Sequence, residues 1–270
     1  MIIEILKKIL IEKESLPSSF HVLYLKEALQ SEILSFIYSH KEYKDLLFYW
    51  WTSMRFILWL NRLSEDLDFV YPWIFVYEKL SDDLKNYFSW LWLHVDSKIQ
   101  KFRITLKFRN LLDLFWLKYQ NSSDLYLKIE ISDHLWFCKN FTSKLYPINH
   151  LYKSFLVRSF DESTLFSTKL NAVLYRKWEK MTPRWLLYIK WRDFYDLMWY
   201  LQKWIQPNIN CIQDIETIDE LKTKLTQVIE STDFTQVVAD IRWLIEDTSM
   251  VEFMEEGGKQ YILDKIRTLQ

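Results

Sequence analysis

The sequence predicts an α+β protein with a mixed sheet flanked by helices in its N-terminal half and a helical C-terminal half. Apolar side chains recur at every second residue over 102–108 and again over 125–131, which is the period of half-buried strands. Over 17–40 they recur at intervals of three and four residues, which predicts a helix. After about residue 155 the pattern becomes mainly helical. We therefore expect two domains, 1–155 and 156–270.

The other elements follow from the same periodicities and from turn signals. For the helix over 17–40 we expect a cap at Ser18 or Ser19. A buried strand, a helix, an acidic strand and another helix are then predicted in order at 46–49, 52–60, 64–70 and 78–94. In the second half, helices are predicted at 163–180, 192–203, 217–230, 233–246 and 249–268.

Composition places the chain among folded proteins of the cytoplasm. Of its 270 residues 50% are hydrophobic and 26% charged, and the formal net charge is −1, which gives no sign of a nucleic-acid partner. No apolar run reaches the roughly 18 residues of a membrane span, and the N-terminus does not resemble a signal peptide. Cys138 and Cys211 lack metal-type spacing. We therefore expect neither a zinc site nor a disulfide framework.

The clearest chemical signal is a pair of carboxylates within the acidic strand. Asp66 and Asp68 are separated by one residue, so on a strand they share one face while Leu67 and Phe69 share the other. Two carboxylates this close repel one another unless a cation lies between them. Oxygen ligands suit Mg²⁺, so the pair predicts a magnesium site.

The residues before this strand become interpretable when tryptophan is exchanged for glycine. Average usage of about 7% predicts roughly 19 glycines in a chain this long, yet the sequence has 2, together with 14 tryptophans. Some genetic codes read the UGA codon as glycine and others as tryptophan. We infer that many tryptophans here are glycine in the native protein, and we expect UGA codons at positions 50, 51, 59, 185, 191 and 204. The pair Trp90 and Trp92 is a further candidate for Gly-Leu-Gly.

With glycine at 50, 51 and 59, residues 49–69 become Gly-Gly-Thr-Ser, a helix, Gly-Leu-Asn-Arg and Ser-Glu-Asp-Leu-Asp-Phe. This stretch resembles the signature of the AbiEii/AbiGii-type toxins, which are nucleotidyltransferases of the DNA polymerase β superfamily. The resemblance implies an N-terminal nucleotidyltransferase domain. It also implies a third metal-binding carboxylate on a neighbouring strand, for which Glu130 is the candidate. A solvent-facing glutamate on an edge strand is the alternative interpretation of that residue.

A second motif strengthens the resemblance, which covers roughly residues 45–208. Lys169 is followed seven positions later by Arg176, so both cations project from one side of a helix. Reading Trp191 as glycine then gives Lys-Gly-Arg-Asp-Phe-Tyr-Asp-Leu, which contains Arg192, Asp193 and Asp196. This order is similar to the second hallmark of the toxin family. Taken alone, the same residues would be an ordinary solvated face and helix N-terminal charges.

The resemblance implies roles for these residues. The backbone at Trp50, Trp51, Thr52 and Ser53 would cradle the phosphates of a nucleoside triphosphate, with a hydroxyl contact from Ser53. Asp66, Asp68 and Glu130 would bind Mg²⁺, as two ions. Lys169 would bind the triphosphate. Asp193, Asp196 and the cations Arg176 and Arg192 would complete the site or position the acceptor.

The implied partners are a nucleoside triphosphate, a tRNA or protein acceptor and a cognate antitoxin, with no membrane partner. Two alternatives stay open. One is a nucleotidyltransferase that modifies a small molecule such as an antibiotic. The other is a non-catalytic protein whose tryptophans stack on single-stranded nucleic acid or sugar.

Overall fold

The computed structural model describes residues 2–133, 138–176, 178–179, 187–188 and 191–270. The chain forms two compact units. The first comprises 1–135 and 143–159, and the second 136–142 and 160–270. The division into domains at residue 155 that the sequence suggests remains a proposal. Among the described residues, no helix has the length and hydropathy needed to cross a bilayer.

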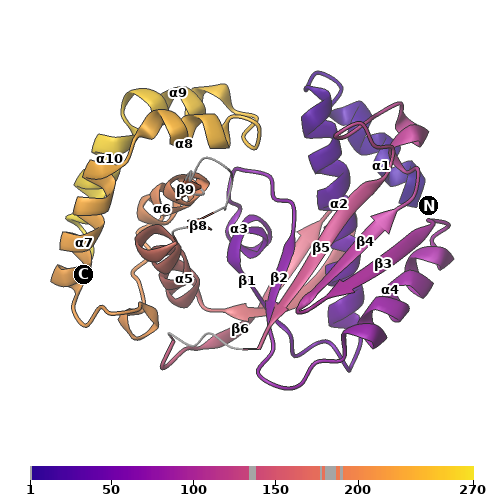
Figure 1. Cartoon of the computed structure of the whole chain (residues 1–270), viewed down its shortest axis with the longest axis horizontal. Coiled ribbons are helices and arrows are strands. Elements are labelled where there is room, and N and C mark those ends of the chain that lie inside the picture. The colour runs from indigo at the N-terminus through magenta and orange to yellow at the C-terminus, as the bar shows by residue number, and fades with distance from the viewer. Residues whose placement is uncertain (1, 134–137, 177, 180–186, 189–190) are drawn as a thin grey trace. The chain divides into compact units, whose positions relative to one another are not determined.

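The first unit is built on a seven-stranded mixed sheet of order β3-β4-β5-β2-β1-β7-β6 (Figure 1). Its strands are β1 (Leu47–Tyr49), β2 (Leu67–Val70), β3 (Val95–Gln100), β4 (Arg103–Phe108), β5 (Leu125–Ser132), β6 (Ser143–His150) and β7 (Lys153–Phe160). Its helices are α1 (Ile2–Glu12), α2 (Ser18–Ser39), α3 (Trp50–Leu58), α4 (Tyr77–Trp90) and the 3₁₀ turn η1 (Leu112–Phe115). Helix α2 packs on β5, and α4 on β3 and β4.

The strands predicted from alternation are confirmed. On β5 the four apolar residues of the alternating set are buried, while Lys128 and Glu130 are only partly covered on the other face. The acidic strand β2 is shorter than expected, because it begins at Leu67 and leaves Asp66 in the preceding loop. The predicted cap of α2 is wrong: the helix follows Pro17, and neither serine makes a capping hydrogen bond.

Three strands of this sheet, β3, β6 and β7, were not predicted. No residue of β3 is buried and β6 buries only Ile148, so neither carries the apolar alternation by which a strand is recognised. The helix predicted over 78–94 therefore ends early, at Trp90, and β3 begins at Val95.

The second unit is mainly helical, as expected. Its elements are α5 (Glu162–Tyr175), β8 (Trp178–Glu179), β9 (Leu187–Tyr188), α6 (Arg192–Gln202), the 3₁₀ turn η2 (Ile209–Cys211), α7 (Ile218–Ser231), α8 (Phe234–Ile241), α9 (Thr248–Glu256) and α10 (Gly258–Ile266). Helix α5 ends five residues before the predicted boundary at 180. The helix predicted over 249–268 is divided at Gly257.

A disulfide in this unit corrects the expectation for the cysteines. Cys138 and Cys211 are bonded to each other across 73 residues of sequence. Asn208 lies beside them, and its side chain donates to the Asn140 carbonyl at 2.8 Å. Spacing along the chain carried no sign of this pairing, because the fold alone brings the two segments together.

Tryptophan occupies backbone positions that favour glycine. Left-handed φ angles are disfavoured for residues with a Cβ atom. Five of the twelve described non-glycine residues with positive φ are nevertheless tryptophans, with φ between 57° and 66°. They are Trp50, Trp59, Trp92, Trp116 and Trp204.

Four of these positions lie at the end of a helix, where a left-handed glycine commonly stops it. Trp59 and Trp116 are the C-caps of α3 and η1, while Trp92 and Trp204 lie two residues after α4 and α6. The backbone supports native glycine at these four sites and at Trp50. It gives no such support at Trp191, whose φ is −60°, and position 185 lies outside the described residues.

Candidate active site

The acidic strand lies in the middle of the first unit's sheet, next to a strand that carries a third carboxylate. Strand β2 pairs with β5 in parallel, and the register places Asp68 directly beside Glu130. In such a pair the side chains of matched residues point to the same face. Because β5 lies between β4 and β2, the alternative interpretation is wrong in placing Glu130 on an edge strand, although its side chain is partly exposed.

Two cations from the same sheet face contact these carboxylates. Lys128 Nζ lies 3.7 Å from Asp66 Oδ2, and Arg103 Nη2 lies 2.5 Å from Glu130 Oε1. Burial raises the pKa of Asp66; Lys128 opposes that rise, while Glu130 adds to it. Sequence reasoning missed both cations as site residues, although each was visible on the polar face of an alternating strand.

The carboxylates have the chemistry of a site for a hard divalent cation. All three offer oxygen ligands, which Mg²⁺ prefers, and Asp68 and Glu130 are matched in register. Within the described residues, however, no group of three or more His, Cys, Asp or Glu side chains is arranged to hold a metal ion. The three residues supply the oxygen ligands that the ion prefers, but the Asp66 and Glu130 side chains are paired with Lys128 and Arg103 instead of converging on one point.

The turn into α3 is joined to the acidic loop by hydroxyl groups. Thr52 Oγ1 lies 2.7 Å from Ser64 Oγ and also donates to the Asp66 carbonyl. Ser53 Oγ donates to the Trp50 carbonyl at 2.7 Å, so this hydroxyl is used within the turn. Thr52 and Ser53 are fully buried. These bonds fix the N-terminus of α3 relative to the loop that carries Asp66.

A buried ionic cluster positions α3 from its other side. Glu27 of α2 accepts hydrogen bonds from Arg55 Nε at 2.9 Å and from His150 Nε2 at 3.0 Å, and Arg55 also donates to the Leu60 carbonyl. Burial acts to raise the pKa of Glu27, but the bond from His150 and the charge of Arg55 outweigh it and lower the pKa to about 2. The cluster therefore contains an ionised glutamate.

The second predicted motif forms a buried cluster in the helical unit. Lys169 Nζ of α5 lies 2.8 Å from Asp196 Oδ2 and 3.3 Å from Asp193 Oδ1, both on α6. Arg176 Nη1 lies 3.6 Å from the other oxygen of Asp193. The side chains of Lys169, Asp193 and Asp196 are at most 3% exposed. The expectation that Lys169 and Arg176 project from the same side is confirmed, because both reach Asp193.

Arg192 begins α6 beside this cluster. Its backbone N–H donates to Asp240 Oδ2 of α8 at 3.1 Å, which satisfies a donor at the helix N-terminus. Asp240 was not singled out from the sequence, because an isolated aspartate in a predicted helix carries no signal.

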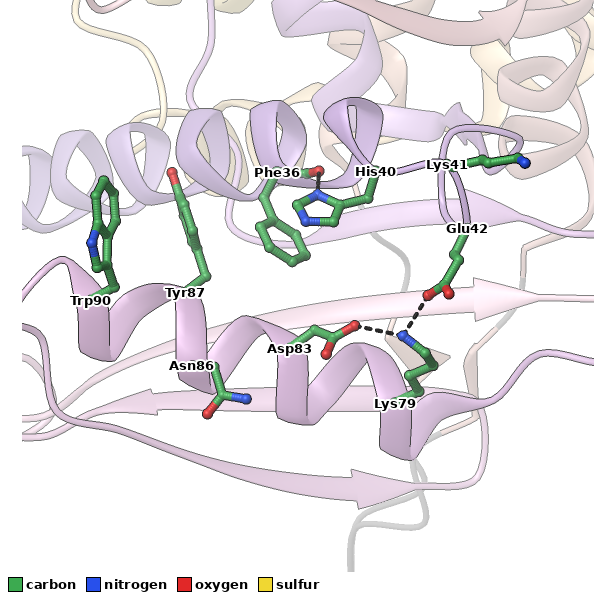
Figure 2. Close-up of a pocket in the computed structure, with 9 residues that line it drawn as sticks. All are labelled: Phe36, His40, Lys41, Glu42, Lys79, Asp83, Asn86, Tyr87 and Trp90. Carbon is green, nitrogen blue, oxygen red and sulfur yellow. Dashed lines mark hydrogen bonds and ion pairs between the residues drawn. The ribbon is translucent and has the colours of Figure 1, made fainter.

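A pocket of about 600 Å³ lies elsewhere in the first unit, between α2 and α4 (Figure 2). One wall is aromatic, with the Phe36 and Tyr87 rings 4.9 Å apart between centroids. At the other end Lys79 pairs with Glu42 and Asp83. None of the predicted site residues lines this pocket, so it is separate from the carboxylates.

The chain is a nucleotidyltransferase, as its match to a family of these enzymes shows, and the carboxylates on central strands accord with that class. Residues 52–257 match the family described as "Nucleotidyl transferase AbiEii toxin, Type IV TA system". Because the match spans more than half of the chain, the protein belongs to the AbiEii family of nucleotidyltransferase toxins. Membership implies a nucleotide substrate and a cognate antitoxin. The match begins at Thr52, directly after the two tryptophans of the turn.

Two solved structures are similar to this chain. One is a candidate nucleotidyltransferase from H. pylori, 16% identical, with a TM-score of 0.50 over 91% of this chain and 97% of that one. The other is JHP933 from Helicobacter pylori, also 16% identical, with a TM-score of 0.47 over 91% of this chain and 94% of that one. The first shares the fold, which accords with the predicted class. No curated protein sequence matches this chain significantly.

Proposed function

We propose that this enzyme transfers a nucleoside monophosphate from a nucleoside triphosphate to a macromolecular acceptor in a Mg²⁺-dependent reaction. The acceptor hydroxyl attacks the α-phosphorus, a new P–O bond forms, the bond to the β-phosphate oxygen breaks and pyrophosphate leaves. The hydroxyl proton passes to solvent or to a carboxylate. The observation that carries the proposal is the pairing of Asp68 with Glu130 beside the anchored turn into α3.

In this proposal Asp66, Asp68 and Glu130 hold the metal. When bound, Mg²⁺ neutralises the phosphates and stabilises the charge that develops on the attacking and leaving oxygens. The N-terminus of α3 receives the phosphates through its backbone N–H groups. Lys169 acts as a nucleotide-binding cation, and its pairs with Asp193 and Asp196 fix where its ammonium group lies. Arg176 and Arg192 assist from the same cluster.

The acceptor is a tRNA or a protein, and the site of action is the cytoplasm, where nucleoside triphosphates are found. Incubation of the chain carrying glycine at 50, 51 and 59 with each α-labelled nucleoside triphosphate, Mg²⁺ and a tRNA or protein pool tests this. Label should enter a macromolecule with release of pyrophosphate, and Asp68→Ala should abolish both. Label that enters only small molecules would favour the antibiotic-type alternative. No transfer under any condition would refute the proposal.

A further inference from the structure

Arg103 and Lys128 pair with carboxylates that the proposed function assigns to a divalent cation. Lys128 precedes Glu130 by two residues on β5, so the two side chains share the face that Asp68 also uses. Arg103 of β4 is matched in register with Glu130. Two of the three candidate ligands therefore each have a cationic partner drawn from the sheet itself.

These two ion pairs are only partly covered from solvent. The side chains of Lys128 and Asp66 are 43% and 34% exposed, and those of Arg103 and Glu130 are 38% and 26% exposed. Partly exposed pairs of this kind contribute little net stability, because water and salt screen them. They can therefore be broken without loss of the fold.

A divalent ion and these two cations would repel one another if they bound the same carboxylates. A Mg²⁺ ion bound to Asp66 or Glu130 would place a double positive charge within a few ångströms of the ammonium or guanidinium group, and like charges at that range repel strongly. The long side chains of lysine and arginine let the charged groups move while their strands stay in place. A triphosphate bound together with the metal would offer both cations a new anionic partner.

We propose that Lys128 and Arg103 are exchangeable partners, which pair with Asp66 and Glu130 until a divalent ion displaces them and then bind the phosphates of the nucleotide. This inference rests on the proposed metal-dependent function. It accounts for the lack of a ready three-carboxylate metal group among the described residues.

The proposal predicts opposite effects of one substitution on the two ligands. In Lys128→Met, a divalent ion no longer has to displace the ammonium group, so it should bind about two- to fivefold more tightly. The nucleotide should bind more weakly in the presence of the metal, because its phosphate partner is gone. Since coupling between two ligands is reciprocal, the factor by which Mn²⁺ strengthens nucleotide binding should fall.

Calorimetric titration with Mn²⁺ alone, at fixed ionic strength, tests the first effect on the chain as it stands. The nucleotide arm uses the chain carrying glycine at 50 and 51, a non-hydrolysable triphosphate and either Mn²⁺ or no metal. Lys98→Met is the matched control, because it removes the same charge from the sheet at another place. Lys98 lies exposed on β3, opposite Thr105, and no ion pair is described for it.

Tighter Mn²⁺ binding in Lys128→Met but not in Lys98→Met supports the exchange. Unchanged or weaker binding in Lys128→Met, or equal tightening in both variants, overturns it. Asp68→Ala separates this result from a failure of the proposed function. If Asp68→Ala leaves Mn²⁺ binding intact, the metal site itself is wrong; if it abolishes binding while Lys128→Met has no effect, only the exchange is wrong.

Discussion

Asp68 on β2 and Glu130 on β5 lie side by side in a parallel register, although 62 positions separate them in the sequence. Neighbouring strands of one sheet hold their carboxylates at a distance fixed by backbone hydrogen bonds, so the pair does not depend on loop conformation. The backbone of a site built in this way is fixed before substrate arrives, so only side chains, such as that of Glu130 paired with Arg103, have to turn.

Asp68→Ala is expected to abolish nucleotide transfer and to leave the fold intact. The Asp68 carboxylate is a proposed metal ligand, and the alanine side chain has no oxygen atom to replace it. Transfer of labelled nucleotide by the chain with glycine at 50, 51 and 59 is the measurement, with circular dichroism as the check on folding. Asp82→Ala is the control, because Asp82 is exposed on α4. Transfer at the parent rate by Asp68→Ala would show that the acidic strand is structural.

Trp92→Gly is expected to raise the free energy of unfolding by about 1–2 kcal/mol, because it relieves a left-handed backbone position that disfavours a side chain. Trp92 has a φ of 65° and is 88% exposed, so little packing is lost. Trp90 is similarly exposed but ends α4 in helical conformation. Trp90→Gly should therefore lower stability by about 0.5–1 kcal/mol. Urea titration of both variants measures the two effects, and a change of the same sign in both would contradict the backbone argument.

Restoring glycine at 50 and 51 is expected to create nucleotide binding that the tryptophan form lacks. Trp50 has a φ of 66° at the N-terminus of α3, and an indole at the proposed phosphate site would fill the space that the phosphates need. Calorimetric titration with Mg²⁺ and a nucleoside triphosphate compares the two forms. Equal affinity would show that the turn is not the phosphate site. Sequencing the codons is an independent check: UGG at most of the predicted positions would end the glycine hypothesis.

Lys169→Met is expected to destabilise the helical unit by about 3–5 kcal/mol, because it removes the ammonium group that lies 2.8 Å from buried Asp196 and 3.3 Å from buried Asp193. Lys222→Met on α7 is a control in the same unit, where the lysine is partly exposed. Thermal unfolding measures the difference. A melting temperature within the range of the control would contradict the expectation that the pairs of Lys169 with Asp193 and Asp196 stabilise this unit.

Glu27 is expected to make stability depend on pH below about 4.5. Its pKa is lowered from 4.5 to about 2 in the folded chain, so the folded state binds the proton less readily than the unfolded state. The resulting contribution of about 3 kcal/mol is present above the unfolded pKa and is lost as the pH falls towards 2. Urea titrations from pH 6 to pH 2 should show a shallower decline for Glu27→Gln. If the free energy of unfolding of Glu27→Gln declines with pH as steeply as that of the parent chain, groups other than Glu27 cause the pH dependence.

The sequence predicts those parts of the fold that have a regular pattern. Strands β4 and β5 alternate buried and partly exposed residues, so period two identifies them and places Glu130 on the polar face. Strand β3 has no buried residue, so its side chains show no pattern that predicts a strand. Its extended conformation depends on backbone pairing with β4. Cys138 and Cys211 illustrate the same limit, because a contact across 73 residues leaves no local trace.

The residues of the candidate site also differ in how far a local sequence pattern could predict them. The spacing of Asp66 and Asp68 predicted a strand that carries both carboxylates, and the structure places Asp68 on that strand and Asp66 in the loop before it. The grouping of Lys169 with Asp193 and Asp196 required the family resemblance, because each residue alone is typical of a solvated helix. The partners Lys128 and Arg103 could not be assigned, since which cation faces which carboxylate depends on the register between strands.

The left-handed backbone at Trp50 bears on how such a gene behaves after transfer between organisms. If codon 50 is UGA, one ribosome inserts glycine and leaves room for the phosphates, whereas another inserts an indole at a position with a φ of 66°. The recipient would then synthesise a toxin that is inert from the first copy, with no antitoxin needed. The codon assignment of the host would then limit the spread of the gene, because the toxin would be active only in lineages that translate UGA as glycine.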